Sequence, residues 1–165
     1  MQRKIKLVID SDLENIPLIG TAINKLCSLI PLSDEEAFQM ELCVVEAVTN
    51  SIKHAYGYDS EHQVEINFVL SSEELTVDIC DKGTPLDKEL MEKKFREPLE
   101  CDDTDPENVP EGGRGLAIIN TIMDNVSYKS EKGINCLTMK KRFNLLVGDA
   151  KGPVNGLGGC PRMAP

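Results

Sequence analysis

Glu46-Ala-Val-Thr-Asn50-Ser-Ile-Lys-His54 is the stretch that decides the fold of this 165-residue chain. Its carboxylate, carboxamide and imidazole stand at positions i, i+4 and i+8, so on a helix they form one polar ridge. Val44, Val48 and Ile52 keep helical spacing beside this ridge and predict a stripe that packs on a core. Upstream, Ser33-Asp-Glu-Glu36 has the form of a capping box, so the sequence predicts that a long helix begins there.

The rest of the chain predicts a sheet on which such helices can pack. The expected strands are 4–9, 64–70, 75–79, 126–130 and 136–142, and the expected helices are 13–30, 33–55, 87–95 and 114–125. This order of elements is typical of an α+β sandwich with helices on one face of a mixed, mostly antiparallel sheet.

Composition excludes some classes of function. The formal net charge of −10 argues against direct, nonspecific binding to nucleic acid, which needs a cationic surface. Aromatic residues make up only 4% of the chain, so we expect an aliphatic core. The first residues carry no signal-peptide pattern, and no apolar run approaches the length of a membrane span. A cytoplasmic protein without membrane contact is expected.

The six cysteines do not predict a metal site. None of them forms a C-x-x-C pair, and only two histidines are present, so zinc binding is not expected. Cys43 and Cys80 stand in apolar segments and are predicted to be small core residues. A reducing compartment is the natural setting for such a chain.

Two segments depart from the pattern of a packed domain. Residues 97–113 contain three Pro, seven acidic residues and no Lys or Arg, which predicts a long acidic loop. Residues 144–165 are rich in Gly and Pro, which predicts a flexible tail. The expected division is therefore a domain at 1–143 and a tail at 144–165.

The polar ridge can support metal and proton chemistry. Asn is unfavourable within a helix, so Asn50 calls for an explanation, and its carboxamide oxygen suits Mg²⁺. Glu46 could then accept a proton from an attacking hydroxyl or water. The alternative is an ordinary solvated helix face. His54 has a second interpretation as a residue near the C-terminus of a helix, where it favours the dipole.

Two glycine motifs extend this site. In Asp81-Lys-Gly83-Thr-Pro85 the carboxylate can accept from the exocyclic amine of adenine, and Gly83 lets the backbone approach the ring. Asp81 can equally be a turn former at the end of a strand. In Gly112-Gly-Arg-Gly-Leu116 the backbone N–H groups at a helix start can bind phosphate, with charge-assisted contacts from Arg114. The alternative there is a hinge; no Gly-Lys-Ser/Thr follows, so it is not a Walker A loop.

Taken together, these motifs resemble those of the GHKL superfamily of ATP-binding proteins. Residues 1–142 are most similar to its short anti-sigma-factor serine/threonine kinases of the RsbW type. The resemblance implies a Bergerat ATP-binding fold that uses ATP and Mg²⁺. It implies Glu46 as general base and Asn50 as Mg²⁺ ligand. The residues then expected to bind the cofactor are Asn50, His54, Asp81, Gly83, Gly113, Arg114, Gly115, Leu116 and Thr138.

The resemblance also implies partners. These are a sigma factor, an anti-sigma antagonist that accepts phosphate on Ser or Thr, and a second copy of the chain in a homodimer. A different class of function is a nucleotide-binding switch that sequesters a partner without effective phosphotransfer, which the acidic loop favours because its charges repel a triphosphate. The catalytic domain of a histidine kinase is less favoured, because the 45 residues before Glu46 leave no room for a phosphoacceptor hairpin.

Overall fold

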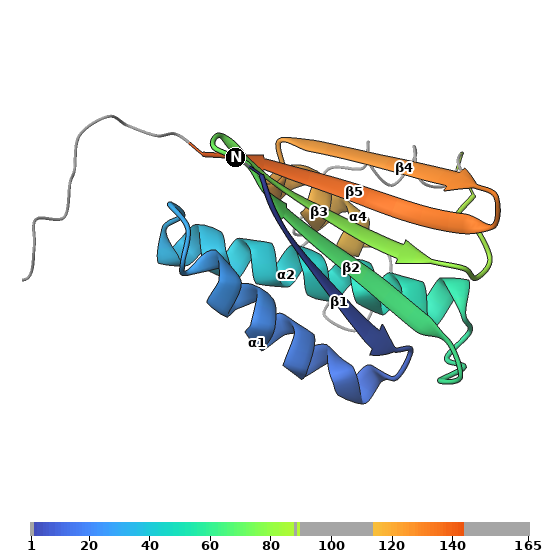
Figure 1. The fold of residues 1–165 in the computed structure, drawn as a ribbon. Coiled ribbons are helices and arrows are strands. Elements are labelled where there is room, and N and C mark those ends of the chain that lie inside the picture. Colours follow the sequence, from blue (N-terminus) through green and yellow to red (C-terminus); the bar gives the residue numbers. More distant parts are fainter. Residues whose placement is uncertain (1, 88, 90–113, 144–165) are drawn as a thin grey trace, which may run out of the picture.

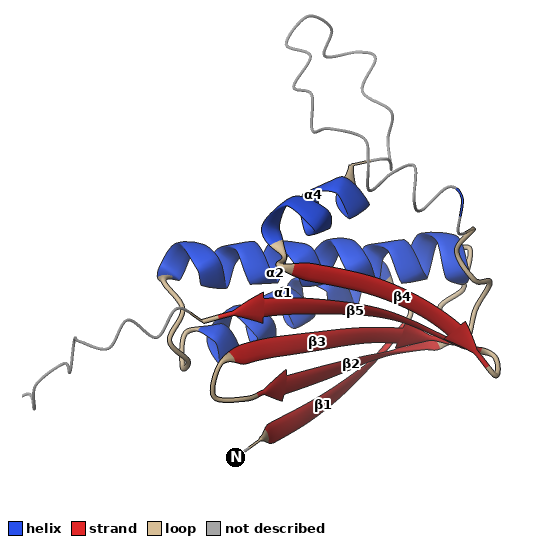
Figure 2. Cartoon of the chain, turned by 90° about the horizontal axis from the view of Figure 1, so that it is seen from above, coloured by secondary structure: helices blue, strands red, loops and turns tan. Residues whose placement is uncertain are grey.

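An antiparallel sheet of five strands carries the helices on one face (Figures 1 and 2). The computed structural model describes residues 2–87, 89 and 114–143. Within them the strand order is β1-β2-β3-β5-β4, and every neighbouring pair is antiparallel. The strands are β1 (Arg3–Asp10), β2 (Gln63–Leu70), β3 (Glu74–Asp81), β4 (Asn125–Glu131) and β5 (Ile134–Arg142). The predicted α+β class is confirmed.

The helices follow the sequence signals closely at their starts. They are the short 3₁₀ turn η1 (Leu13–Asn15), α1 (Ile16–Cys27), α2 (Asp34–Asn50), the π-helical turn η2 (Ser51–Ala55) and α4 (Gly115–Ile122). The capping box is present: the Glu36 N–H donates to Ser33 Oγ at 3.2 Å, and the Ser33 N–H donates to Glu36 Oε2 at 2.8 Å. Two backbone donors at the start of α2 are thereby satisfied.

An aliphatic core lies between the helices and the sheet. The predicted stripe of α2 is buried, with Val44 and Val48 at 0% exposure and Ile52 at 1% in η2. It packs against the inward residues of the strands, such as Ile66 and Val77, which alternate with outward polar residues. The expectation of an aliphatic core is confirmed.

The end of the long helix differs from the sequence prediction. The Tyr56 N–H donates to the Ser51 carbonyl at 3.1 Å, a bond across five residues that defines a π turn. A π turn contains more residues than an α turn. The polar side chains therefore keep α-helical spacing only as far as Asn50. His54 therefore does not stand one regular turn after Asn50.

Several other expectations require correction or lie elsewhere. The predicted helix 13–30 is split into η1 and α1, and Pro17 stands in the first turn of α1, where it is tolerated. The helix expected at 114–125 ends at Ile122. The expected helix 87–95, the acidic loop and the tail lie wholly or largely outside the described residues.

The cysteines follow the prediction in part. Cys43 is buried at 0% exposure in the core, as predicted. Cys80 is buried at 9% exposure, but it points to the outward face of β3, where it forms a disulfide with Cys136 of β5 and lies outside the core cluster. In the described part of the chain, no helix combines the length and the apolar character needed to cross a membrane.

Candidate nucleotide-binding site

The first part of the site lies where α2 meets the start of α4. Gly115 opens α4 directly beside the polar ridge of α2. A Cβ at this position would collide with Glu46 Oε2 and would lie 3.4 Å from Asn50 Nδ2. Glycine therefore lets the start of α4 approach the Glu46 carboxylate closely, and a Cβ would force that carboxylate to shift. The structure thus brings three predicted residues together, Glu46, Asn50 and Gly115.

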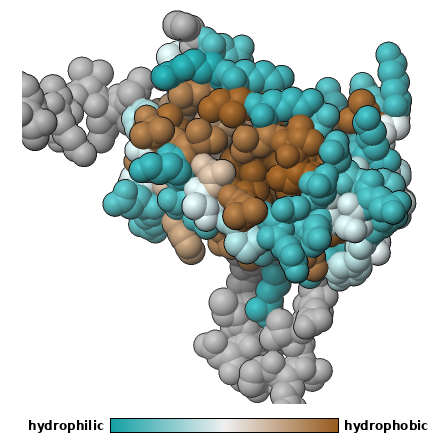
Figure 3. Space-filling view, turned by 60° about the horizontal axis from the view of Figure 1, so that its bottom comes forward, coloured by the Kyte–Doolittle hydropathy of each residue, from teal (hydrophilic) through white to brown (hydrophobic). Residues whose placement is uncertain are grey.

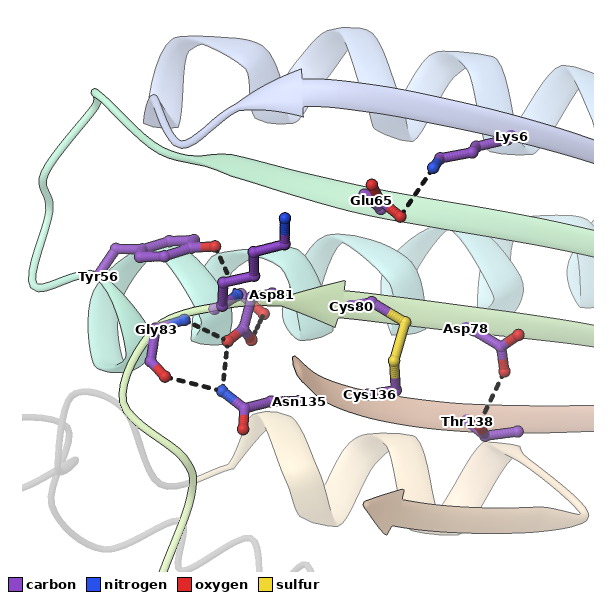
Figure 4. The surroundings of a disulfide bond; sticks show 12 residues. Lys6, Tyr56, Glu65, Asp78, Cys80, Asp81, Gly83, Asn135, Cys136 and Thr138 are labelled. Atoms are coloured by element: carbon purple, nitrogen blue, oxygen red, sulfur yellow. Dashed lines mark hydrogen bonds and ion pairs between the residues drawn. A yellow bond between two sulfur atoms is a disulfide. The ribbon is translucent and has the colours of Figure 1, made fainter. Parts of the chain in front are cut away.

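The second part of the site is a buried carboxylate at the end of β3. Asp81 is 8% exposed and accepts three hydrogen bonds (Figure 4). Ser51 Oγ donates to Oδ2 at 3.0 Å, while Asn135 Nδ2 and the Gly83 N–H donate to Oδ1 at 2.8 and 3.1 Å. A carboxylate offers about four acceptor positions, so roughly one stays available for an outside donor such as an exocyclic amine.

A tight turn after Asp81 explains why position 83 is a glycine. The Thr84 N–H donates to the Ala55 carbonyl at 2.9 Å, which holds the turn against η2. A Cβ at Gly83 would collide with that carbonyl oxygen and would stand 2.8 Å from Ala55 Cβ. The Asn135 amide also donates to the Gly83 carbonyl at 2.9 Å. The turn is thus held from both sides, which fixes the backbone next to the carboxylate.

A narrow cavity connects the two parts. It has a volume of about 20 Å³, and its lining includes Asn50 and Asp81 together with Leu86, Leu116 and Tyr128. That is room for about one water and not for a purine. A base therefore enters only if the walls move apart.

One wall of this cavity is held by a hydrogen bond. The Leu86 N–H donates to the Tyr128 hydroxyl at 2.8 Å. Burial raises the pKa of Tyr128 above its usual value; the bond from Leu86 opposes this, and the Asp81 carboxylate adds to it. The phenol therefore stays neutral at physiological pH.

The remaining predicted residues are placed as follows. Leu116 is buried and lines the cavity. Arg114 is the exposed N-cap residue of α4. His54 is exposed in η2 and is not among the cavity residues. Gly113 lies outside the described residues.

Thr138, expected to support the adenine site, lies in the last strand but points away from Asp81. Its hydroxyl donates to Asp78 Oδ1 at 2.7 Å, on the face opposite Leu137 and the core. Asn135, which the sequence reasoning missed, lies directly opposite Asp81 and is 2% exposed. The missed signal was period-two alternation, because residue 135 shares the face of the buried Leu137.

Comparison with known proteins places the chain in a family. The model described as "Histidine kinase-like ATPase domain" matches residues 9–141, a span that contains both parts of the site.

The chain belongs to this family.

Individual members of the histidine kinase-like ATPase family show where it lies within that group. It is 29% identical over 140 residues to "Serine-protein kinase RsbW" of Listeria monocytogenes, with 85% of this chain and 88% of the relative covered. It is 32% identical over 148 residues to "Anti-sigma F factor" of Clostridium acetobutylicum, with 88% and 98% covered. The resemblance to a GHKL anti-sigma kinase is confirmed.

Solved structures agree on the fold. The RsbU and RsbW domains of a Mycobacterium tuberculosis protein match 85% of this chain and 32% of theirs, with a TM-score of 0.58 and 12% identity. A chain of the SiaB–SiaC complex from Pseudomonas aeruginosa matches 84% of this chain and 89% of its own, with a TM-score of 0.52 and 16% identity. At these identities the likeness concerns the fold alone.

Proposed function

We propose that the protein is a cytoplasmic anti-sigma factor with ATP-dependent protein serine/threonine kinase activity. It phosphorylates an anti-sigma antagonist on Ser or Thr and sequesters a sigma factor. The names of its relatives, serine-protein kinase and anti-sigma F factor, support both halves of this function. The family match supports the use of ATP.

One observation carries the assignment of the site. Asn50 of α2 and Asp81 of β3 line one cavity. Gly115 of α4 lies directly beside Glu46 and Asn50, and a Cβ at Gly83 would collide with the backbone of Ala55. The exposed backbone N–H groups at a helix start favour binding of phosphate. The carboxamide oxygen of Asn50 favours Mg²⁺, and the carboxylate of Asp81 favours the amine of adenine. ATP with Mg²⁺ fits this chemistry.

Each residue then has one task. Bound Mg²⁺-ATP supplies the γ-phosphoryl group and neutralises its charge. Asp81 accepts the adenine amine, and Asn50 supplies a carboxamide oxygen to Mg²⁺. Glu46 accepts the proton of the attacking Ser or Thr hydroxyl. The backbone N–H groups at the start of α4 and the guanidinium of Arg114 would bind the phosphates.

Replacing Asn50 by Ala tests the metal site. We expect the variant to lose the extra affinity that Mg²⁺ gives to ATP, while its binding of metal-free ATP changes little. Calorimetric titration of ATP with Mg²⁺ and with a chelator measures both quantities. Asn67→Ala is the matched control, because Asn67 pairs with Asp78 on the outward face of the sheet. If Asn50→Ala retains the Mg²⁺ dependence of the native protein, Asn50 belongs to a solvated helix face.

The side of the molecule that bears α1 and β1 supports a homodimer. β1 is an edge strand, as predicted, so part of its backbone is available for pairing. Exposed apolar side chains lie on these elements and beside them, including Ile5 at 40%, Leu13 at 41% and Leu18 at 68% exposure. Figure 3 brings this side forward and shows apolar side chains gathered in its middle. Patches of this kind mark association surfaces.

Light scattering tests the homodimer. At micromolar concentration we expect a particle of about 36 kDa, twice the 18.2 kDa of the chain. Leu18→Glu should shift the particle toward the monomer, because it places a charge in the apolar surface. Ile134→Glu, an equally drastic change at the exposed start of β5 and away from β1, should leave it dimeric. A native particle of 18 kDa at this concentration would exclude the dimer.

A further inference from the structure

A disulfide joins β3 and β5, the two strands that carry Asp81 and Asn135 of the proposed adenine site. Cys80 of β3 and Cys136 of β5 are direct cross-strand partners, with Cα atoms 4.2 Å apart. Cys80 immediately precedes Asp81, and Cys136 immediately follows Asn135. Figure 4 shows the bridge next to the hydrogen bond between these two polar side chains. The bridge thus joins the residues next to Asp81, the proposed adenine contact, and next to Asn135, which donates a hydrogen bond to it.

The bridge lies on the face of the sheet that the helices leave uncovered. Residues 80 and 136 alternate with the inward Ile79 and Leu137, so their side chains point outward. Cys136 is only half-buried, whereas Cys80 is 9% exposed and borders an open hollow of about 660 Å³. Exchange reagents can therefore reach the Cys136 sulfur from solvent.

The other two cysteines of the described residues behave differently. Cys27 and Cys43 are both at 0% exposure, and burial raises the pKa of each thiol to about 12. Thiolate is the reactive form, so both are inert to exchange near neutral pH. Among the described cysteines, Cys136 is thus the one that is not buried, and its disulfide partner is Cys80.

We infer that Cys80 and Cys136 form a thiol–disulfide exchange site that sets nucleotide affinity, an inference that rests on the proposed ATP site. The oxidant is a small-molecule disulfide, RSSR. The thiolate of the more exposed Cys136 attacks one sulfur of RSSR and releases one RS⁻. The thiolate of Cys80 then attacks the Cys136 sulfur and releases the second RS⁻. Two protein thiols lose two protons and two electrons, RSSR becomes two RSH, and a dithiol reductant reverses the change.

The strand register makes this chemistry reversible without refolding. Backbone pairing of β3 with β5 and the buried contact of Ile79 with Leu137 hold the strands in place without the bridge. The bridge only reduces the range over which Asp81 moves relative to Asn135. Restricting a binding group to its bound geometry raises affinity. The oxidised protein therefore binds adenine nucleotide more tightly than the reduced protein.

The first measurement establishes the exchange. The full chain is treated with dithiothreitol or with glutathione disulfide, free thiols are alkylated, and the modified peptides are identified by mass. Cys80 and Cys136 are expected to be alkylated after dithiothreitol and protected after glutathione disulfide. The experiment is repeated with Cys101 and Cys160, which lie outside the described residues, both replaced by Ser. Alkylation of both Cys80 and Cys136 after glutathione disulfide would overturn the inference.

The second measurement is calorimetry of ADP binding to the two forms. The oxidised form is expected to bind about 3–10-fold more tightly than the reduced form, because the position of Asp81 relative to Asn135 is better preorganised. The double variant Cys80→Ser and Cys136→Ser should bind ADP with the same affinity after either treatment, because it cannot form the bridge. Equal affinity of the two native forms would overturn this inference and leave the ATP site intact. No ADP binding by either form would overturn the proposed function itself.

Discussion

Replacing Glu46 by Gln is expected to lower phosphoryl transfer to the antagonist by about 10²–10⁴-fold, the range typical of a lost general base. Glutamine keeps the size and polarity of the side chain that borders Gly115, so the packing of α4 on α2 is preserved. It cannot take the proton of the acceptor hydroxyl. Binding of Mg²⁺-ATP and of the sigma factor is expected to remain near the native level. Transfer is followed by labelled phosphate, and nucleotide binding by calorimetry.

Glu35→Gln is the matched control for this variant. Glu35 stands in the first turn of the same helix and is exposed, so the same loss of charge occurs far from the site. Its transfer rate is expected to equal that of the native protein. If the native protein and Glu46→Gln transfer equally little phosphate, while both still sequester a partner in a nucleotide-dependent way, the protein is a binding switch. The acidic composition of residues 97–113 is what keeps that alternative open.

Asp81→Asn is expected to weaken ATP and ADP binding alike, by about 10–100-fold. This range corresponds to the roughly 1.5–3 kcal/mol of a hydrogen bond to a charged group. An asparagine at this position also places an N–H₂ group near Asn135 Nδ2 or Ser51 Oγ, which now donate to the carboxylate. Both effects disturb the base-reading position and spare the phosphate-facing groups. Calorimetry with each nucleotide measures the change.

Asp78→Asn is the control for Asp81→Asn. Asp78 stands three residues earlier on the same strand but on the outward face, where it accepts from Thr138. Its replacement is expected to leave ATP affinity unchanged. The native protein is expected to bind GTP poorly, because guanine carries a carbonyl where adenine carries the amine. Equal affinity of the native protein for ATP and GTP would remove Asp81 from base reading.

Local sequence signals were sufficient for the start of the long helix and for the face that it buries. The Ser33–Glu36 capping box and the apolar stripe from Val44 to Ile52 specify where α2 begins and which face it buries. The ridge of Glu46 and Asn50 follows from the same periodicity. The π turn does not, because it depends on how η2 packs against the turn at Gly83. That contact joins segments about thirty residues apart, beyond the reach of helical spacing.

Features that depend on strand register were the ones missed or misplaced. The predicted last strand begins at Cys136, two residues after the observed start at Ile134, so Asn135 lay outside the prediction. Its pairing with Asp81, and the bridge of Cys136 with Cys80, join positions 54 and 56 residues apart in the chain. Such pairings are set by the alignment of two strands. The alternation of side chains along a strand already places Thr138 on the face opposite the apolar Leu137, and so away from the adenine site.

The central claim is that this chain transfers phosphate from ATP to a protein hydroxyl. Its most direct test is incubation of the full chain with [γ-³²P]ATP, Mg²⁺ and a candidate antagonist encoded nearby, followed by identification of the labelled residue. The proposed function predicts label on a Ser or Thr of the antagonist, formed with the native protein and nearly absent with Glu46→Gln. Absence of label with the native protein and every candidate antagonist, under conditions where calorimetry shows ATP bound, would contradict it.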